Sequence, residues 1–359
     1  MAAMLVGAAV YMIDPPAVRT YQGIFPKWLL ATVYLWHFVV LPIAVIATAL
    51  SAGAVWFAHR GESSSTEGQE ISRRRLLGAV AAMAPPIVLV PFVAASRWQV
   101  GRFRIRRIEV PFASLPPALD GLTIAQVTDM HVGRFTPPRV MPDLVAAVRE
   151  LDADLVVHLG DLIDYVLDDL DTALDAVVQM RGRYGSAMIL GNHDLYEDRD
   201  AFIRRSREAG IELLVDEALT IPIGDAAVQL LGLDYNADDG LMADSVRRLM
   251  AQRQAEAFAI LLAHHPHAWD PATSAALPLT LAGHTHGGQL HISPRVGFGP
   301  AVFRYWSGLY RRGESALVVA NGVSSWLPLR SYAPAEIVHL TLRTKGEATA
   351  ERPKNAEVG

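Results

Sequence analysis

The stretch Leu155–Asp164 has the sequence LVVHLGDLID and joins a run of apolar residues to two carboxylates. A short, continuous apolar run of this kind predicts a strand buried on both faces. Gly160 ends the run, and Asp161 and Asp164 follow it directly. In an open α/β sheet, ligands bind beyond the carboxyl ends of the strands. The stretch therefore predicts a buried strand that delivers two acidic side chains to a site.

Four other apolar runs end in the same way, in polar residues that can bind metals. The predicted strands are Ile124–Val127, Leu155–Leu159, Met188–Leu190, Ile260–Ala263 and Leu279–Leu281. They lead into Asp129-Met130-His131, Gly160-Asp161-Leu162-Ile163-Asp164, Gly191-Asn192-His193-Asp194, His264-His265-Pro266-His267 and Gly283-His284-Thr285-His286-Gly287-Gly288. Five strand ends thus bring Asp, Asn and His to one edge.

Segments with helical spacing separate the first three runs. Pro138–Glu150 and Leu167–Met180 each place apolar residues on one face, and Val228–Leu233 and Leu317–Val319 add further strands. Alternation of strands and helices predicts an α/β fold built in layers.

The donor types indicate the kind of cofactor. The chain contains no cysteine, which excludes thiolate ligands and a cysteine nucleophile. Imidazole and carboxylate suit Zn, Fe or Mn better than Ca or Mg. Because the donors exceed what one ion needs, we expect two divalent or trivalent metal ions that share one Asp. Such a pair can stabilise both oxygens of an in-line phosphoryl displacement.

Taken together, these motifs resemble the calcineurin-like metallophosphoesterase superfamily: D-x-H, G-D-x-x-D, G-N-H-D, a His at a strand end and G-H-T-H. The longer match Gly283–Gln289, GHTHGGQ, and the apolar segments before it resemble the bacterial membrane-anchored or twin-arginine-exported phosphodiesterase branch. The resemblance covers about Leu115–Arg343. It implies a layered αββα domain that hydrolyses phosphodiester or pyrophosphate bonds by a metal-bridged hydroxide.

The resemblance also implies a role for each motif residue. His131 and His286 would bind the first metal with Asp129, Asp161 would bridge both ions, and the second site would be completed by Asn192, His264 and His284. His193 would protonate or stabilise the leaving oxygen. Asp164 would hydrogen-bond His193 and hold its tautomer.

Several neighbouring residues have ordinary structural interpretations. We expect His158 to lie in the core, Asp194 to brace its turn, and His265 and His267 to be loop or pocket residues. Tyr196 is within reach of the site, but a loop tyrosine is an equally good interpretation.

The N-terminal section differs in composition. Residues 1–96 carry six Lys and Arg and four Asp and Glu, whereas the remainder carries 26 and 33. Trp28–Ala58 and Leu76–Ser96 contain no charged residue, and about 20 apolar residues suffice to cross a bilayer. We expect transmembrane helices at about 28–58 and 76–96, a juxtamembrane linker at 97–114, the metallophosphoesterase domain at 115–343 and a flexible tail at 344–359.

The arginines between the two apolar runs indicate an orientation. Residues 59–75 include Arg60, Arg73, Arg74 and Arg75, which favours a cytoplasmic loop. Ser72–Leu77, SRRRLL, is similar to a twin-arginine export signal. Five arginines within 97–107 weigh against this orientation. On balance we expect a protein of the bacterial inner membrane whose catalytic domain lies on the extracytoplasmic side.

A membrane anchor would place the site near lipid headgroups. Membrane lipids are therefore expected partners, and the phosphoester substrate could be lipid-linked. One alternative is a hydrolase of a nucleotide-linked lipid A precursor that faces the cytoplasm. Another is a non-catalytic metal-binding membrane protein, which would be expected to lack a ligand or the His193–Asp164 pair. The acidic C-terminal section argues against nucleic-acid coating, and no obligate protein partner is inferred.

Overall fold

The computed structural model describes residues 93–345 except 134, 294 and 295, together with residues 41, 45, 48, 49 and 53. The expected membrane spans lie almost entirely outside these residues, as does the tail from residue 346 onward. Among the residues that the structure describes, no helix has the length and apolar character needed to cross a membrane. The chain divides into two compact units, and the larger one, Gln99–Trp326 with Arg330–Gly359, contains all the candidate site residues.

This larger unit contains a five-stranded sheet in the order β1-β13-β2-β3-β4. The β13–β2 pair is antiparallel and the other neighbours are parallel. The strands are β1 (Phe103–Phe112), β2 (Thr123–Val127), β3 (Leu155–Leu159), β4 (Gly185–Ile189) and β13 (Ala335–Thr344).

A six-stranded sheet in the order β11-β12-β8-β7-β6-β5 lies against the first. Its central strands are parallel, and antiparallel hairpins form its two edges. The strands are β5 (Glu217–Ile223), β6 (Ala226–Gly232), β7 (Phe258–Leu262), β8 (Leu279–Ala282), β11 (Gly308–Arg312) and β12 (Ser315–Val319). A short pair, β9 (His291–Ser293) and β10 (Val296–Gly297), stands apart from both sheets.

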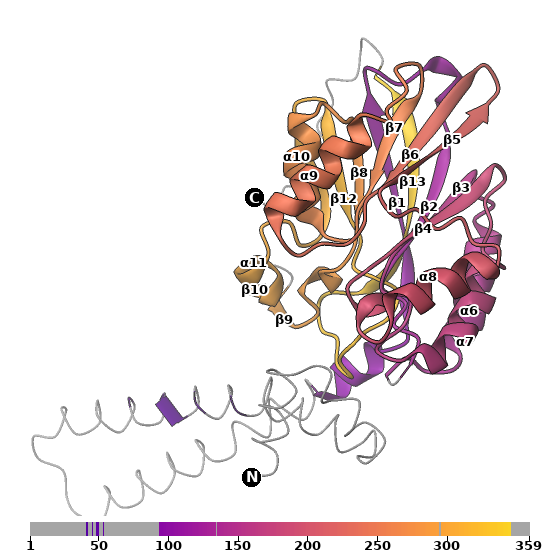
Figure 1. Cartoon of the computed structure of the whole chain (residues 1–359). Helices are drawn as coiled ribbons and strands as arrows, with labels where there is room; N and C mark the ends of the chain where they lie inside the picture. The colour runs from indigo at the N-terminus through magenta and orange to yellow at the C-terminus, as the bar shows by residue number, and fades with distance from the viewer. Residues whose placement is uncertain are drawn as a thin grey trace, which may run out of the picture. The chain divides into compact units, whose positions relative to one another are not determined.

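Alternate residues of the strands build separate cores on the two faces of each sheet. Val157 of β3 and Ile260 of β7 belong to one core between the sheets, whereas Val156 of β3 packs with the helices outside. The outer helices of the first sheet are α6 (Val140–Glu150), α7 (Leu170–Val177) and α8 (Arg199–Glu208), and those of the second are α9 (Asp239–Met250) and α10 (Trp269–Ser274) (Figure 1). The predicted α/β class is confirmed, and the layers run helix, sheet, sheet, helix.

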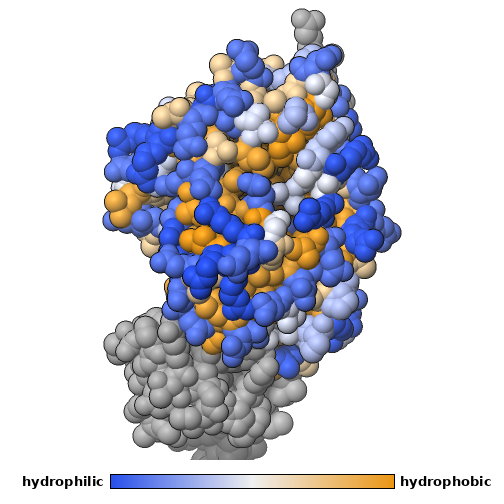
Figure 2. Space-filling model, turned by 45° about the vertical axis from the view of Figure 1, so that its right-hand side comes forward, coloured by the Kyte–Doolittle hydropathy of each residue, from blue (hydrophilic) through white to orange (hydrophobic). Residues whose placement is uncertain are grey.

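The outer surface of this unit is mixed in character. Hydrophilic residues cover much of the face shown in Figure 2, and apolar residues are exposed between them. Such exposure is normal, because apolar atoms supply more than half of the accessible surface of a folded protein.

The predicted elements correspond to observed ones with small shifts at their ends. The run Leu155–Leu159 is β3 without change. The strand predicted at Ile260–Ala263 is β7, which begins earlier, at Phe258, and ends earlier, at Leu262. The predicted helix Leu167–Met180 consists of a 3-10 turn followed by α7, which ends at Val177.

The segment 97–114 differs from the expected linker, because β1 lies within it and pairs with β13 along its full length. Glu336 of β13 is fully buried and forms ion pairs with Arg104 (3.2 Å) and Arg106 (2.8 Å) of β1. The arginines of this segment made it look like a linker in the sequence. Their charge is partly neutralised by a carboxylate more than 200 residues away.

Candidate metal centre

The candidate ligands gather just beyond the carboxyl ends of β2, β3, β4, β7 and β8. Three groups of side chains with donor atoms within 4.8 Å of one another form there. One contains His131, Asp164 and His193, and the other two share Asp161. Of these two, the first contains Asp129, His131, Asp161 and His286, and the second contains Asp161, His264 and His284.

In the first group, the donor atoms converge on one point. His286 Nε2 lies 3.0 Å from His131 Nε2 and 3.2 Å from Asp129 Oδ1. His131 Nε2 also lies 3.5 Å from Asp161 Oδ2. The other oxygen of Asp129 is occupied, since it accepts hydrogen bonds from the Thr128 hydroxyl and the His284 backbone N–H. Its Oδ1 is therefore the oxygen directed at the group.

In the second group, His264 Nε2 lies 3.2 Å from Asp161 Oδ2. His264 Nδ1 donates to the carbonyl oxygen of Leu159 at 2.6 Å, which directs Nε2 at the site. Asn192 joins this group, since its Oδ1 lies 3.0 Å from His284 Nδ1. All seven residues expected as ligands are therefore brought together.

Burial and charge shift the titration of these groups strongly. Burial lowers the pKa of His131 to about 4, so its imidazole is neutral at pH 7. Burial also acts to lower the pKa of His264, but the charge of Asp161 outweighs it and raises that pKa to about 9. Burial opposes the charge of Asp129, yet the neighbouring His286 holds its pKa well below the ordinary value. The buried carboxylates thus favour positively charged groups at this site.

The backbone is strained at the same residues. Five of the seven candidate ligands have a left-handed φ, between 41° and 69°: Asp129, His131, Asp161, His284 and His286. Non-glycine residues rarely adopt this conformation, which costs about 1–3 kcal/mol each and clusters at functional sites. The strain indicates that the placement of these side chains is maintained at a cost in stability.

Two motif glycines allow the backbone to approach the ligands closely. A Cβ atom on Gly191 would lie 2.2 Å from Asp161 Oδ1, and one on Gly283 would lie 2.6 Å from Asp129 Oδ2. Any larger residue at these positions would displace a carboxylate of the site.

His193 and Asp164 meet beside the first group, but not in the expected way. His193 Nδ1 lies 2.6 Å from the backbone carbonyl oxygen of Asp164 and 3.7 Å from its carboxylate Oδ1. The carboxylate is also 3.5 Å from His131 Nδ1. The backbone N–H of His193 donates to Asp161 Oδ1 at 2.9 Å. The carbonyl therefore makes the closer contact with His193.

Arg330 adjoins the site although no motif contains it. Its side chain is fully buried, and Nη2 lies 3.1 Å from His286 Nδ1. Nη1 donates to the carbonyl oxygens of Asn321 and Ala333. In the sequence, the feature that could have indicated its role is that this arginine lies within the mostly apolar stretch 326–335.

A pair of tyrosines also lines the site. The hydroxyl of Tyr196 accepts a hydrogen bond from Asn192 Nδ2 at 3.0 Å. Tyr165 stacks on Tyr196, with ring centroids 5.5 Å apart and ring planes 13° apart. Burial raises the pKa of Tyr196 above its ordinary value, so its hydroxyl is protonated at neutral pH.

The residues expected to be structural occupy such positions. His158 is 3% exposed within β3, and burial lowers its pKa to about 4, which keeps it neutral. Asp194 accepts hydrogen bonds from the backbone N–H groups of Gly191 and Leu162, and so braces its turn. His265 Nδ1 accepts a hydrogen bond from the N–H of His267 instead of joining either group.

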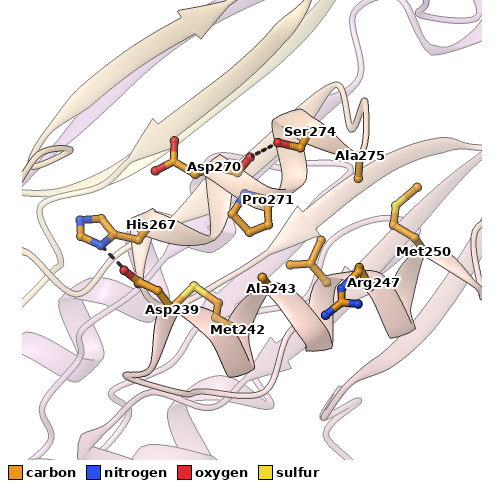
Figure 3. A pocket seen from close by; sticks show the side chains of 11 residues that line it. Asp239, Met242, Ala243, Arg247, Met250, His267, Asp270, Pro271, Ser274 and Ala275 are labelled. Carbon is orange, nitrogen blue, oxygen red and sulfur yellow. Dashed lines mark hydrogen bonds and ion pairs between the residues drawn. The ribbon is translucent and has the colours of Figure 1, made fainter.

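A cavity of about 750 Å³ lies elsewhere, between α9 and α10 (Figure 3). Met242, Val246 and Met250 form part of its apolar lining, and His267 stands at one end beside Asp239. None of its lining residues belongs to the groups at the strand ends. The clustered donors, and not the cavity, mark the candidate site.

Comparison with known proteins gives a consistent result. Residues 122–288 match the family model described as calcineurin-like phosphoesterase. The chain is 32% identical over 234 residues to an uncharacterized metallophosphoesterase of Campylobacter jejuni, covering 64% of this chain and 62% of that protein. It is 30% identical over 254 residues to a Danio rerio protein named transmembrane protein with metallophosphoesterase domain, covering 66% of this chain and 56% of that protein. It is 29% identical over 282 residues to the phosphodiesterase YaeI of Escherichia coli, covering 76% of this chain and 99% of that protein. The chain thus spans less than two thirds of the first two relatives.

Proposed function

We propose that this chain, which carries a calcineurin-like metallophosphoesterase domain, is a membrane-anchored phosphoesterase that uses two metal ions to hydrolyse phosphodiester or pyrophosphate bonds. The observation that carries this proposal is the convergence of seven candidate ligands into two groups that share Asp161. The name of the phosphodiesterase relative, which this chain matches over 99% of that protein, supports the reaction type.

The residues present fit a pair of metal ions. Asp129 Oδ1 and His264 Nε2 are buried and form no hydrogen bond with the described residues, so both are available to a cation. The donors are nitrogen and oxygen only, which favours Zn, Fe or Mn. Bound ions would supply Lewis acidity and lower the pKa of water. We assign Asp129, His131 and His286 to one ion, Asn192, His264 and His284 to the other, and Asp161 to both.

The chain's own residues would then orient the substrate and move a proton. His193 Nδ1 donates to the carbonyl oxygen of Asp164, so Nε2 is the ring atom left to exchange a proton. We assign to Nε2 the protonation of the leaving oxygen, and to Asp164 the orientation of the ring. Both members of this pair and every ligand are present, which favours an enzyme over a non-catalytic metal-binding protein.

For the membrane, we propose spans at about 28–58 and 76–96 and a lipid-linked phosphoester substrate near the headgroups. Relatives from Danio rerio and Bos taurus are named transmembrane proteins, which supports an anchor. The ion pairs of Arg104 and Arg106 with Glu336 weaken the argument against a domain outside the cytoplasm. They give two of the five arginines after the second span a role in folding, independent of orientation.

Hydrolysis of a generic aryl phosphodiester by the purified full-length protein in detergent tests the reaction. We expect hydrolysis that a chelator abolishes and that Zn, Fe or Mn restores. Asp161→Asn should bind fewer metal ions and remain inactive under all these conditions. Wild-type protein that holds two metal equivalents but hydrolyses neither phosphodiesters nor pyrophosphates would favour the non-catalytic alternative.

A further inference from the structure

The amide of Asn192 has two chemically different ends, and only one can bind a metal ion. The oxygen has lone pairs to offer, whereas the NH₂ group is a donor of hydrogen bonds. In the structure, Nδ2 donates to the Tyr196 hydroxyl at 3.0 Å, and Oδ1 lies 3.0 Å from His284 Nδ1. The two ends therefore face different partners, and the oxygen faces the second group.

The hydroxyl of Tyr196 is held in place by contacts that do not involve Asn192. Its ring stacks on Tyr165 and lies 4.8 Å from the ring of His193. The backbone is fixed as well, because the short turn His193–Leu195 joins Asn192 to Tyr196 and the Tyr196 N–H donates to His193. The hydroxyl is thus positioned before it meets the amide.

We infer that Tyr196 is a positioning residue that holds the Asn192 amide with its oxygen directed at the second metal position. The torsion that turns an Asn amide is broad and roughly two-fold, so the side chain has little preference of its own between its two ends. A fixed partner for Nδ2 supplies that preference. This inference rests on the proposed function, in which Asn192 is a ligand of the second ion.

Tyr196→Phe removes the hydroxyl and keeps the ring that stacks on Tyr165. Mutation of residues that orient metal ligands typically costs 10–100-fold in metal affinity. Titration of the metal-free full-length protein with Mn²⁺ should therefore show the second equivalent weakened by about 10–100-fold and the first equivalent unchanged. Activity on an aryl phosphodiester should fall at limiting Mn²⁺ and recover in excess Mn²⁺. A residue that contacted the substrate would not be rescued in this way.

Tyr165→Phe is the matched control, since it removes the hydroxyl of the other ring in the stack and should leave both affinities unchanged. Asn192→Ala is the second control and should lose the second equivalent. Unchanged affinity for both equivalents in Tyr196→Phe, beside a loss in Asn192→Ala, would overturn the inference alone. Unchanged affinity in Asn192→Ala would instead overturn the ligand assignment of the proposed function. Loss of activity in Tyr196→Phe that excess Mn²⁺ does not restore would show that Tyr196 acts on the substrate.

Discussion

At the level of single residues, the centre is organised around Asp161. Its Oδ2 lies within 3.5 Å of nitrogen atoms of His131 and His264, and its Oδ1 accepts the N–H of His193. One carboxylate thus contacts both groups of candidate ligands and the backbone of the expected proton donor. Its φ of 52° shows that the chain departs from ordinary conformation to place it there.

The run His264-His265-Pro266-His267 offers a matched pair of variants. His264 Nε2 lies beside Asp161, whereas His265 Nδ1 is engaged by the N–H of His267. We therefore expect His264→Ala to lose one metal equivalent and nearly all activity, and His265→Ala to keep both equivalents and most activity. Metal analysis and phosphodiesterase rates of the two proteins decide this. If His265→Ala is the variant that loses the metal, the ligand assignment is displaced by one residue.

Asp164 offers a test of how His193 is oriented. Because the closer contact of His193 Nδ1 is with the carbonyl oxygen of Asp164, a change of side chain leaves that contact in place. We expect Asp164→Asn to keep both metals and to lower kcat by less than about tenfold. Removal of the proton donor itself, in His193→Asn, should cost about 10²–10⁴-fold. Equal losses in the two variants would show that the carboxylate, and not the carbonyl, supports His193.

At the level of elements, the sequence predicted best where apolar runs are continuous. β3 is buried at every position, so its limits follow from hydrophobicity alone. β1 carries Arg104, Arg106 and Arg107 among its first five residues, and no local pattern distinguishes it from a basic linker. What makes it a strand is its parallel pairing with β13, which comes more than 200 residues later. Long-range pairing of this kind is invisible to a window of neighbouring residues.

In the candidate site, too, residues in short local motifs were predicted, and contacts made through loops or backbone atoms were not. The candidate ligands follow predicted strands in short motifs, so their types and spacing predicted that they meet at one edge, whereas their division between two metal positions came from the family resemblance. Arg330 and Tyr196 contact His286 and Asn192 through loop geometry that no motif encodes. The carbonyl contact of Asp164 was also beyond prediction, since a sequence specifies side chains and leaves backbone hydrogen bonds open.

The β1–β13 pair allows a test of buried against exposed charge. Glu336 is fully buried between two arginines, whereas Glu109 of β1 pairs with Arg343 of β13 at the surface. We expect Glu336→Ala to lower the free energy of unfolding by about 2–4 kcal/mol, because it leaves Arg106 without its buried partner. Glu109→Ala should cost less than about 1 kcal/mol. Urea unfolding of the full-length protein in detergent, followed by circular dichroism, compares them. Similar costs would mean that Glu336 contributes no more than a surface pair.

At the level of the whole molecule, the absence of cysteine makes the orientation directly measurable. The sequence contains no cysteine, so a single introduced thiol is the only target for a maleimide. Ala255 is exposed in the loop between α9 and β7. Ser65 belongs to the arginine-containing segment 59–75. The two positions thus report on the catalytic domain and on the segment between the proposed spans.

We expect a membrane-impermeant maleimide to label Ala255→Cys in intact spheroplasts and Ser65→Cys only after the membrane is permeabilised. The expectation follows from the positive charge of 59–75, which favours the cytoplasmic side, and from the single proposed span that separates this segment from the domain. The cysteine-free wild type controls for background labelling. The reverse pattern would place the domain in the cytoplasm and favour the lipid A precursor hydrolase as the alternative. Labelling of both positions in intact spheroplasts would mean that residues 76–96 do not cross the membrane.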